Sequence, residues 1–493
     1  KTNSDTEIII EAYKAWGVNC LKEFNGMFAF IIFDLKKRLF FIARDRFGEK
    51  PLFIGKGSLN TTIFASEMKA ILIHPMISDT INNESIEKFA TSQWLEDRDE
   101  TFFENIKRFP SSSYAIYSEY GDLLDLKKFW QPSYDLGKNH CSVREYIDEF
   151  NKLLKKSIEL RLNADVPVGS SISGGLDSSA IADLLRKNIK KDINFKTFSA
   201  VFPNDPDISE HKQIEALENA LGFKNLKVSP NPESLQKELK SLHWHQEEPF
   251  LSASIFLQWC VAKLARDQQT TVLLDGQGAD ELLGGYQFYF KMYQIDMLKK
   301  GKRKKIFRES NKFTNRLLFE AKYHSDPLRR FNPNIALNNT QLNLLSLNQP
   351  SFPLNSNYSY PQNIFKDGNY FKKTIYEALL YNSLPMLLRY ADRNSMAFSR
   401  EVRLPFLDYE LVDFAINLPL NILIRNGWQK YPIRCVLSDE VPKTIKWRRD
   451  KVGYAAPLDN WLRKEMKEWG LSRITDPILN EISGYKSKVV ISE

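Results

Sequence analysis

The chain has 493 residues, which is enough for two or three domains with sizeable hydrophobic cores. Hydrophobic residues make up 43% of it and charged residues 26%, a balance that is ordinary for a globular protein. The net charge of +8 is mild for this length, so it does not by itself indicate a nucleic-acid-binding protein, and local clusters matter more than the total.

The cysteines and the apolar runs exclude two further classes of protein. The four cysteines are far apart in sequence, so they form no CxxC metal site and no disulfide-rich secreted scaffold: Cys20, Cys141, Cys260 and Cys435. The longest apolar run near the start, residues 27–33, is too short to cross a bilayer, and no signal peptide precedes it. We therefore expect a reduced, cytoplasmic protein without membrane insertion. Because the sequence begins at Lys1 without a methionine, we also expect a fragment.

The densest positive cluster spans residues 299–305 and contains six lysines and arginines. Such a cluster could meet nucleic acid or an acidic partner. It lacks the interleaved aromatic residues of a single-strand binding platform, so we expect a solvated helix or loop and no nucleic-acid partner.

The first 65 residues predict one helix followed by a sheet. Residues 5–16 have the pattern of a capped amphipathic helix, and Gly17 ends it. Short β-rich runs separated by turn residues follow, which predict a packed antiparallel sheet. These runs are residues 27–34, 38–44, 51–55 and 62–65.

The sequence of this region resembles the later half of the class II glutamine amidotransferase domain. The resemblance rests on Ser4–Glu7, Phe24–Phe30, Arg44–Leu52, Ala65–Ala70 and Thr101–Pro110. It implies an Ntn-type αββα fold, incomplete at its start, in which Asp5 holds the amino group of glutamine.

The family's nucleophile, an N-terminal cysteine, has no match in this sequence. Cys20 cannot use its own α-amino group as a base, so we interpret it as a core residue. We therefore expect this chain, as written, not to hydrolyse glutamine. We expect the glutaminase-like domain at residues 1–130, a polar linker at 131–142 and a second domain at 143–493, which a helix opens at 143–161.

A phosphate-binding loop is predicted between a strand that begins at Val168 and a helix. Two glycines allow a sharp turn, hydroxyls add donors, and the following helix directs its N-terminal N–H groups at the same point. The residues concerned are Ile172, Ser173, Gly174, Gly175, Asp177, Ser178 and Ser179. Asp177 places a carboxylate in this loop. Because a carboxylate and a polyphosphate are both negatively charged, we expect Mg²⁺ to lie between them. An ordinary glycine turn with a polar helix cap is the alternative.

The string Ser-Gly-Gly-Leu-Asp-Ser-Ser resembles the pyrophosphate loop of the ATP pyrophosphatases, which cleave ATP to AMP and pyrophosphate. Strands are predicted at 195–202 and 271–274 with helices between them, so we expect an α/β fold with a mostly parallel sheet and ligand at its carboxyl edge. Residues 332–369 look like an irregular insertion, and 376–398 and 409–417 predict helices.

A second glycine-rich loop, residues 275–286, follows the strand at 271–274. Asp280 could supply a second Mg²⁺ ligand beside Asp177. Together the two loops resemble the synthetase domain of class B asparagine synthetases. That resemblance implies that Gly276, with Ile172, contacts adenosine. Gln277 departs from the family, whose best-known members have glutamate there, and an amide cannot act as a general base.

Later segments resemble the family's acceptor-binding and phosphate-binding parts. The resemblance implies that Lys430 and Lys451 lie near the phosphates, where they could neutralise the leaving pyrophosphate. The acceptor-binding candidates are Glu248, Arg389, Asp392, Arg393 and Gln277. A purely structural ionic network is the alternative for any of the charged ones.

Three functional hypotheses remain. In the first, the chain adenylates aspartate with ATP and Mg²⁺, and ammonia, normally from glutamine, displaces AMP to give asparagine. In the second, the acceptor is a sugar acid or a peptide carboxylate, as Gln277 and the insertion suggest. In the third, the chain is an inactive nucleotide-binding fragment. Small-molecule substrates are expected in the first two, and a homodimer is left open.

Overall fold

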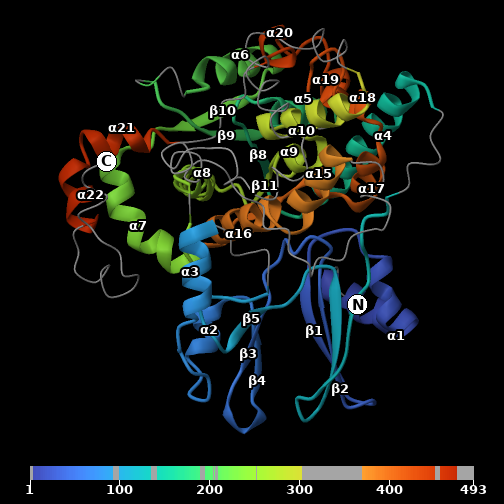
Figure 1. Cartoon of the computed structure of the whole chain (residues 1–493), viewed down its shortest axis with the longest axis vertical. Helices are drawn as coiled ribbons and strands as arrows, with labels where there is room; N and C mark the ends of the chain where they lie inside the picture. The colour runs from blue at the N-terminus through green and yellow to red at the C-terminus, as the bar shows by residue number, and fades with distance from the viewer. Residues whose placement is uncertain are drawn as a thin grey trace.

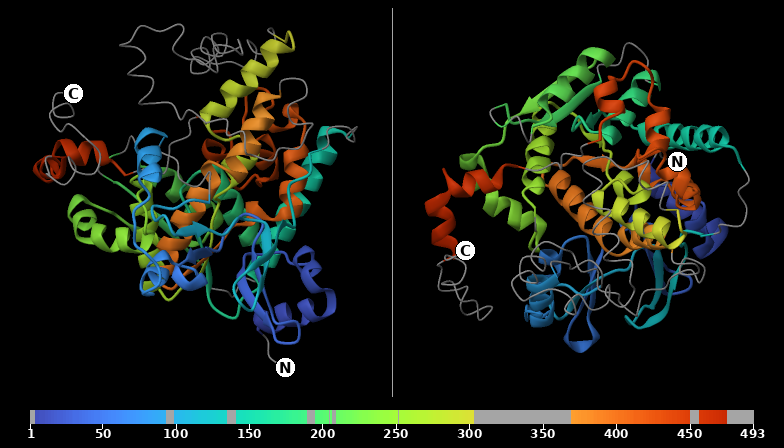
Figure 2. Two further views of the ribbon diagram at one scale, coloured as in Figure 1. Left: turned by 60° about the horizontal axis from the view of Figure 1, so that its bottom comes forward. Right: turned by 45° about the horizontal axis from the view of Figure 1, so that its top comes forward.

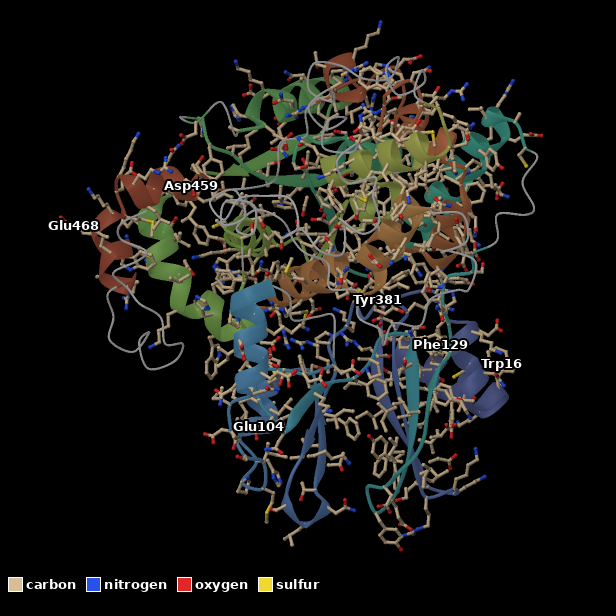
Figure 3. All side chains as sticks on the ribbon, viewed as in Figure 1. Trp16, Glu104, Phe129, Tyr381, Asp459 and Glu468 are labelled. Atoms are coloured by element: carbon tan, nitrogen blue, oxygen red, sulfur yellow. The ribbon has the colours of Figure 1, made fainter. Side chains whose placement is uncertain are left out.

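The computed structural model describes residues 4–92, 99–134, 141–188, 195–203, 205, 209–250, 252–302, 369–449 and 456–474. Figure 1 shows a lower region of antiparallel strands from the first 130 residues and an upper α/β region from the rest of the chain. Phe129 of the lower region and Tyr381 of the upper region, both labelled in Figure 3, lie near the boundary between the two regions.

The lower region contains two antiparallel sheets, whereas the sequence predicted one. The first has the order β1-β2-β6-β7 and the second β4-β3-β5. The strands are β1 (Ala29–Asp34), β2 (Leu39–Arg44), β3 (Phe53–Lys56), β4 (Thr62–Ala65), β5 (Ile106–Arg108), β6 (Ser113–Ser118) and β7 (Leu123–Lys128).

A buried carboxylate explains why the sheet divides between β2 and β3. Asp45 accepts hydrogen bonds from the backbone N–H groups of Phe47, Glu49 and Lys50, and from that of Phe28. These bonds close a tight turn directly after β2. The chain therefore leaves the first sheet, and β3 pairs with β4 and β5.

The helices of the lower region are α1 (Asp5–Trp16), α2 (Met68–Leu72) and α3 (Asn83–Ser92), with short 3-10 turns at Gly17–Lys22 and Ser58–Asn60. The predicted first helix is confirmed, with Ser4 accepting from the N–H of Thr6 at its start and Gly17 at φ 57° at its end. Cys20 is fully buried, as its interpretation as a core residue requires, and burial raises the pKa of its thiol to about 11.

The upper region is built on a five-stranded parallel sheet of order β10-β9-β8-β11-β12, which confirms the predicted fold class. The strands are β8 (Val168–Ser171), β9 (Lys196–Ala200), β10 (Lys224–Val228), β11 (Val272–Leu274) and β12 (Glu401–Arg403). Alternate side chains of β11 enter different cores: Val272 and Leu274 pack into one and Leu273 into the other. Apolar packing on both faces is typical of parallel sheets.

Helices cover both faces of this sheet (Figures 1 and 2). The longer helices are α4 (Val143–Leu162), α5 (Leu176–Asn188), α6 (His211–Leu221), α7 (Pro232–Gln246), α8 (Ser254–Asp267), α10 (Gln287–Lys299), α15 (Tyr370–Leu380), α16 (Ser383–Met396) and α17 (Tyr409–Asn417). The shorter ones are α9 (Ala279–Leu283), α18 (Leu420–Leu423), α19 (Tyr431–Val436), α20 (Lys443–Lys446), α21 (Leu458–Arg463) and α22 (Lys467–Ile474), with a 3-10 turn at Pro405–Leu407.

Two predicted helices are confirmed and one is wrong. The helices at 143–161 and 409–417 appear as α4 and α17, whereas the single helix predicted at 376–398 is two helices, α15 and α16, that meet at residues 381–382. Pro385 lies in the first turn of α16. Proline lacks an N–H and its ring clashes with the carbonyl four residues earlier, here that of Tyr381, so the helix cannot run through.

Several sequence predictions fall outside the described residues. They are the insertion at 332–369 except its last residue, residues 303–305 of the basic cluster, and the middle of the predicted linker, 135–140. The start of that linker is packed: Tyr134 is buried beside Tyr376 and Ile416. Among the residues that the structure describes, no helix combines the length and the apolar character needed to cross a bilayer.

Candidate active site

The first glycine-rich loop joins β8 to α5 at the carboxyl edge of the parallel sheet. Gly174 has φ 76°, a conformation that L-residues rarely adopt, so a glycine is needed to make this turn. The hydroxyl of Ser178 accepts from the N–H of Ser173 at 3.2 Å, and that of Ser179 donates to the carbonyl of Gly175 at 2.7 Å. These bonds hold the loop against the N-terminus of α5, which is thirteen residues long.

The second loop joins β11 to α9 and lies against the first. The two loops are neighbours because β8 and β11 pair in parallel, with Leu274 opposite Ser170. A side chain at Gly276 would begin 3.0 Å from Cβ of Asp177 and 3.1 Å from the backbone nitrogen of Ser178, so it would push against the first loop. The two glycine-rich loops are therefore in direct contact.

Two carboxylates, one from each loop, meet the same buried ammonium. Nζ of Lys430 lies 2.6 Å from Oδ2 of Asp177 and 2.5 Å from Oδ1 of Asp280. Burial alone would lower the pKa of Lys430, but the two carboxylates raise it above its ordinary value. The lysine is therefore held charged at the junction of the loops. Gly285 makes room for this cluster, since its Cβ would lie 1.8 Å from Oδ1 of Asp280.

A cavity of about 410 Å³ opens over these groups. Its volume lies within the range of roughly 300–1,000 Å³ that is usual for small-molecule sites. Of the residues predicted from the sequence, it is lined by Ile172, Ser173, Gly175, Asp177, Ser178, Gly276, Gln277, Asp280 and Lys430. Gly174 and Ser179 do not line the cavity but hold the turn of the first loop. Lys451 lies outside the described residues.

The cavity also contains residues that sequence reasoning missed. One wall is apolar, formed by Phe198, Val261, Leu273 and Val402, and it suits a flat ring such as adenine. The polar lining includes Arg434 beside Lys430, and Arg448, which pairs with Glu210. Arg448 lies three residues before Lys451 in the sequence, but only the fold shows that it lines the cavity.

Gln277 uses its side chain to connect the second loop to α16. Its Nε2 donates to the carbonyl of Leu387 at 3.1 Å, and its backbone N–H donates to Asp275 at 3.1 Å. Burial raises the pKa of Asp275 to about 6. The amide therefore has a positioning contact at the place where the resemblance led us to expect a carboxylate.

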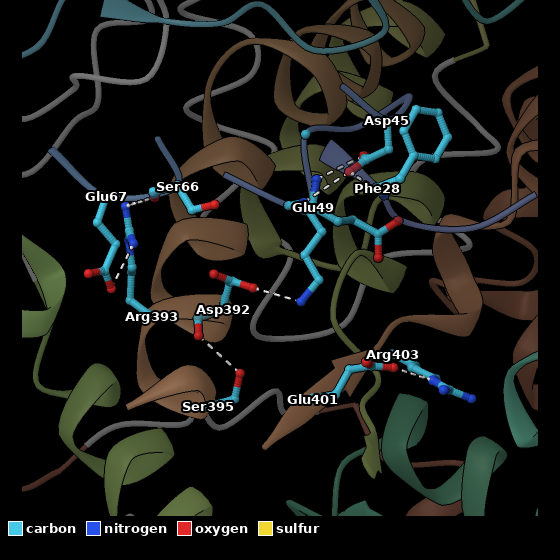
Figure 4. A network of polar contacts seen from close by, with 12 residues as sticks. Phe28, Asp45, Glu49, Ser66, Glu67, Asp392, Arg393, Ser395, Glu401 and Arg403 are labelled. Carbon is cyan, nitrogen blue, oxygen red and sulfur yellow. Dashed lines mark hydrogen bonds and ion pairs between the residues drawn. The ribbon is translucent and has the colours of Figure 1, made fainter. Parts of the chain in front are cut away.

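Four of the predicted acceptor-binding residues do not line the cavity. Glu248 pairs with Arg108 of the lower region, and Asp392 with Lys50 at 3.0 Å. Figure 4 shows Arg393 of α16 directed at Ser66 and Glu67, both in the lower region. Arg389 donates to backbone carbonyls at the end of α7. The structure thus gives Glu248, Asp392 and Arg393 ion pairs between the regions, and it gives Arg389 contacts within the upper region.

Asp5, the predicted glutamine ligand, is exposed in the first turn of α1. Its carboxylate accepts from the N–H of Thr6 at 2.8 Å, which helps to start the helix. It does not line the cavity of the upper region.

Comparison with known families decides between the classes of enzyme that this geometry allows. A family model described as "Asparagine synthase" matches residues 149–490, and one described as "Glutamine amidotransferase domain" matches residues 1–130. The chain belongs to the asparagine synthase family. This confirms the resemblance on which the site prediction was based.

Curated relatives of this asparagine synthase family member cover most of the chain. Asparagine synthetase [glutamine-hydrolyzing] 1 of Bacillus subtilis is 28% identical over 495 residues, covering 95% of this chain and 73% of that protein. A putative asparagine synthetase [glutamine-hydrolyzing] of Mycobacterium bovis is 29% identical, covering 96% and 73%. The amidase chyE of Penicillium rubens is 29% identical over 302 residues, covering 58% and 44%.

Membership of the family makes this chain a carbon–nitrogen ligase that uses ATP. The family forms amides with nitrogen from glutamine, which agrees with the presence of both domain types in one chain. At the carboxyl edge of the sheet, the cavity combines backbone donors and hydroxyls from the two loops with the cations Lys430 and Arg434.

Proposed function

We propose that this chain forms asparagine from aspartate, ATP and ammonia, which the family normally obtains from glutamine. It activates the side-chain carboxylate of aspartate with ATP, and ammonia then takes the place of AMP. The observation that carries the proposal is the convergence of the two glycine-rich loops and Lys430 on one cavity. The curated relatives named as asparagine synthetases support the choice of aspartate.

The reaction has two steps. A carboxylate oxygen of aspartate attacks the α-phosphorus of ATP, the bond from that phosphorus to the bridging oxygen breaks, and pyrophosphate leaves. Ammonia then attacks the acyl carbon of the β-aspartyl adenylate, the bond from that carbon to the AMP oxygen breaks, and the nitrogen loses one proton to solvent. The products are asparagine, AMP and pyrophosphate.

In this scheme the first loop binds the pyrophosphate part of ATP. Backbone N–H groups after Gly174 and the hydroxyls of Ser173 and Ser178 donate to phosphate oxygens, and the N-terminus of α5 favours their negative charge. Lys430 neutralises the charge that builds up on the leaving pyrophosphate. Lys451 remains a second candidate for this role.

The two carboxylates at the cavity fit a magnesium ion bound together with the nucleotide. Asp177 and Asp280 come from adjacent strand ends and reach the same ammonium, so both can face one cation. Mg²⁺ usually takes only one or two protein carboxylates and completes its shell with water and phosphate oxygens. When bound, the ion would offset phosphate charge.

The test is the release of AMP and pyrophosphate from Mg·ATP with aspartate and ammonium chloride, compared with the same mixture without aspartate. Ammonium makes the assay independent of glutamine hydrolysis. We expect aspartate-dependent AMP. Asp177→Asn should lower the rate by about 100-fold or more, while Asp165→Asn, an exposed residue before β8, should not. An unchanged rate in Asp177→Asn would refute the assignment of the metal ligand.

A second candidate function keeps the adenylation and changes the acceptor. It is favoured by Gln277, whose amide binds the carbonyl of Leu387 and offers no base at this position. A sugar acid or a peptide carboxylate would then replace aspartate. Screening such carboxylates for AMP release distinguishes the two functions, since strict dependence on aspartate excludes the second. Any ATP turnover excludes an inactive nucleotide-binding fragment.

A further inference from the structure

The turn that ends α7 has an unusual backbone for the residue it carries. Glu247 has φ 62° and ψ −16°, the left-handed conformation in which helices normally place glycine. A glutamate held in this conformation needs contacts that offset the strain. The side chain of Glu247 is only 4% exposed, and it contacts residues of the lower region as well as Arg393 of the upper region.

Glu247 caps a helix of the other region. Its carboxylate accepts from the backbone N–H of Met68 at 3.1 Å and of Lys69 at 2.8 Å, the first donors of α2. The residue before α2, Glu67, makes no capping bond of its own. Arg393 of α16 lies 2.8 Å from the same carboxylate, so this charge is both paired and hydrogen-bonded.

The residue before Glu247 reaches the wall of the nucleotide cavity. Gln246 is buried, and its Nε2 donates to Oδ1 of Asn394 at 3.0 Å. Asn394 lines the cavity, and it is the neighbour of Arg393 on α16. Two consecutive residues of one turn therefore contact α2 on one side and the cavity wall on the other.

From this geometry we infer that Glu247 is a positioning residue that couples the nucleotide cavity to α2 in the glutaminase-type region. The inference rests on the proposed nucleotide site. A nucleotide in the cavity restrains α16 through its cavity-facing residues, and α16 shares the carboxylate of Glu247 with the start of α2. The start of α2 is then held more firmly when the cavity is filled. By linkage, a chain in which the start of α2 is not restrained binds the nucleotide more weakly, by the same factor as the nucleotide restrains α2.

Hydrogen–deuterium exchange of the whole chain, with and without saturating Mg·ATP, tests this coupling. The peptide spanning residues 66–72 reports on α2, and the peptide spanning 173–179 reports on the cavity itself. Glu247→Gly suits the left-handed backbone and removes the carboxylate, while Glu247→Gln keeps the size and removes the charge. Gln269→Gly is the matched control, because Gln269 is exposed and also left-handed, with φ 58°.

We expect Mg·ATP to slow exchange in both peptides of the unaltered chain and of Gln269→Gly, by about fivefold or more in residues 66–72. In both Glu247 variants the slowing at 66–72 should disappear while that at 173–179 remains. Slowing confined to 173–179 in the unaltered chain, or retained at 66–72 in the variants, would overturn the coupling but leave the nucleotide site intact. No slowing at 173–179 would overturn the nucleotide site and the coupling with it.

Discussion

At the scale of single residues, Glu49 is a carboxyl group buried at the junction of the two regions, beside Asp45 (Figure 4). Burial, with the charge of Asp45, raises its pKa from an ordinary 4.5 to about 8. Arg161 and Lys50 act against this rise without cancelling it. Between about pH 4.5 and pH 8, Glu49 therefore keeps its proton in the folded chain and loses it in the unfolded chain.

This difference predicts how stability depends on pH. Because the folded state holds the extra proton, the free energy of unfolding falls as pH rises from about 4.5 to 8 and this contribution is constant above that range. Glu49→Gln, which is neutral at every pH, should raise the free energy of unfolding at pH 8 by about 1–3 kcal/mol and change it little at pH 4.5. Chemical denaturation at both pH values measures this.

The control for Glu49 is Glu23→Gln, which alters an exposed carboxylate of the same region. It should leave the free energy of unfolding almost unchanged at both pH values. An equal effect of Glu49→Gln at pH 4.5 and pH 8 would show that packing, and not the proton, explains the change.

At the scale of elements, the turn between α9 and α10 is packed too closely for any side chain. A Cβ on Gly285 would lie 1.8 Å from Oδ1 of Asp280 and 1.9 Å from Cε of Lys430. Gly285→Ala should therefore separate the lysine from the carboxylates and lower AMP release by about 100-fold or more. The control is Gly26→Ala, where nothing lies within 4 Å of the new methyl group. Near-normal activity in Gly285→Ala would contradict the proposed role of the cluster.

At the scale of the whole molecule, the two regions are joined by buried ion pairs as well as by apolar contacts. Glu248, fully buried, pairs with Arg108, whose side chain is 10% exposed. Phe47 of the lower region enters the main core of the upper one and contacts Trp130. The association of the two regions therefore depends on buried groups that water does not reach in the folded chain.

Removing one partner of that pair should destabilise the chain strongly. Glu248→Met leaves the Arg108 guanidinium buried without its carboxylate, which should cost about 3–5 kcal/mol in the free energy of unfolding. The double variant Arg108→Met with Glu248→Met should recover a large part of this loss. Arg38→Met, which breaks an exposed pair with Glu119, is the control and should have no measurable effect. Additive effects of the two Met substitutions would contradict a direct pairing.

Local chemistry was sufficient to predict much of the fold and the two glycine-rich loops that line the cavity. Helix α1 is marked by its cap and by Gly17, α4 and α17 by their apolar spacing, and the parallel sheet by apolar runs alternating with helices. The two glycine-rich loops were found because glycine is needed where the backbone turns at Gly174 or where Gly276 meets Asp177. Each of these signals lies within a few residues of the feature it predicts.

Only the tertiary structure decided how distant segments combine. Lys430 meets Asp177 from 253 positions away, and Asp392 meets Lys50 from 342 positions away, so no local pattern could show either contact. The sequence determined the loops, the elements and the family through residues adjacent in the chain. The ion pairing of Lys430, the division of the antiparallel sheet and the interface contacts of α16 follow from burial and charge pairing across the folded molecule, which act through space.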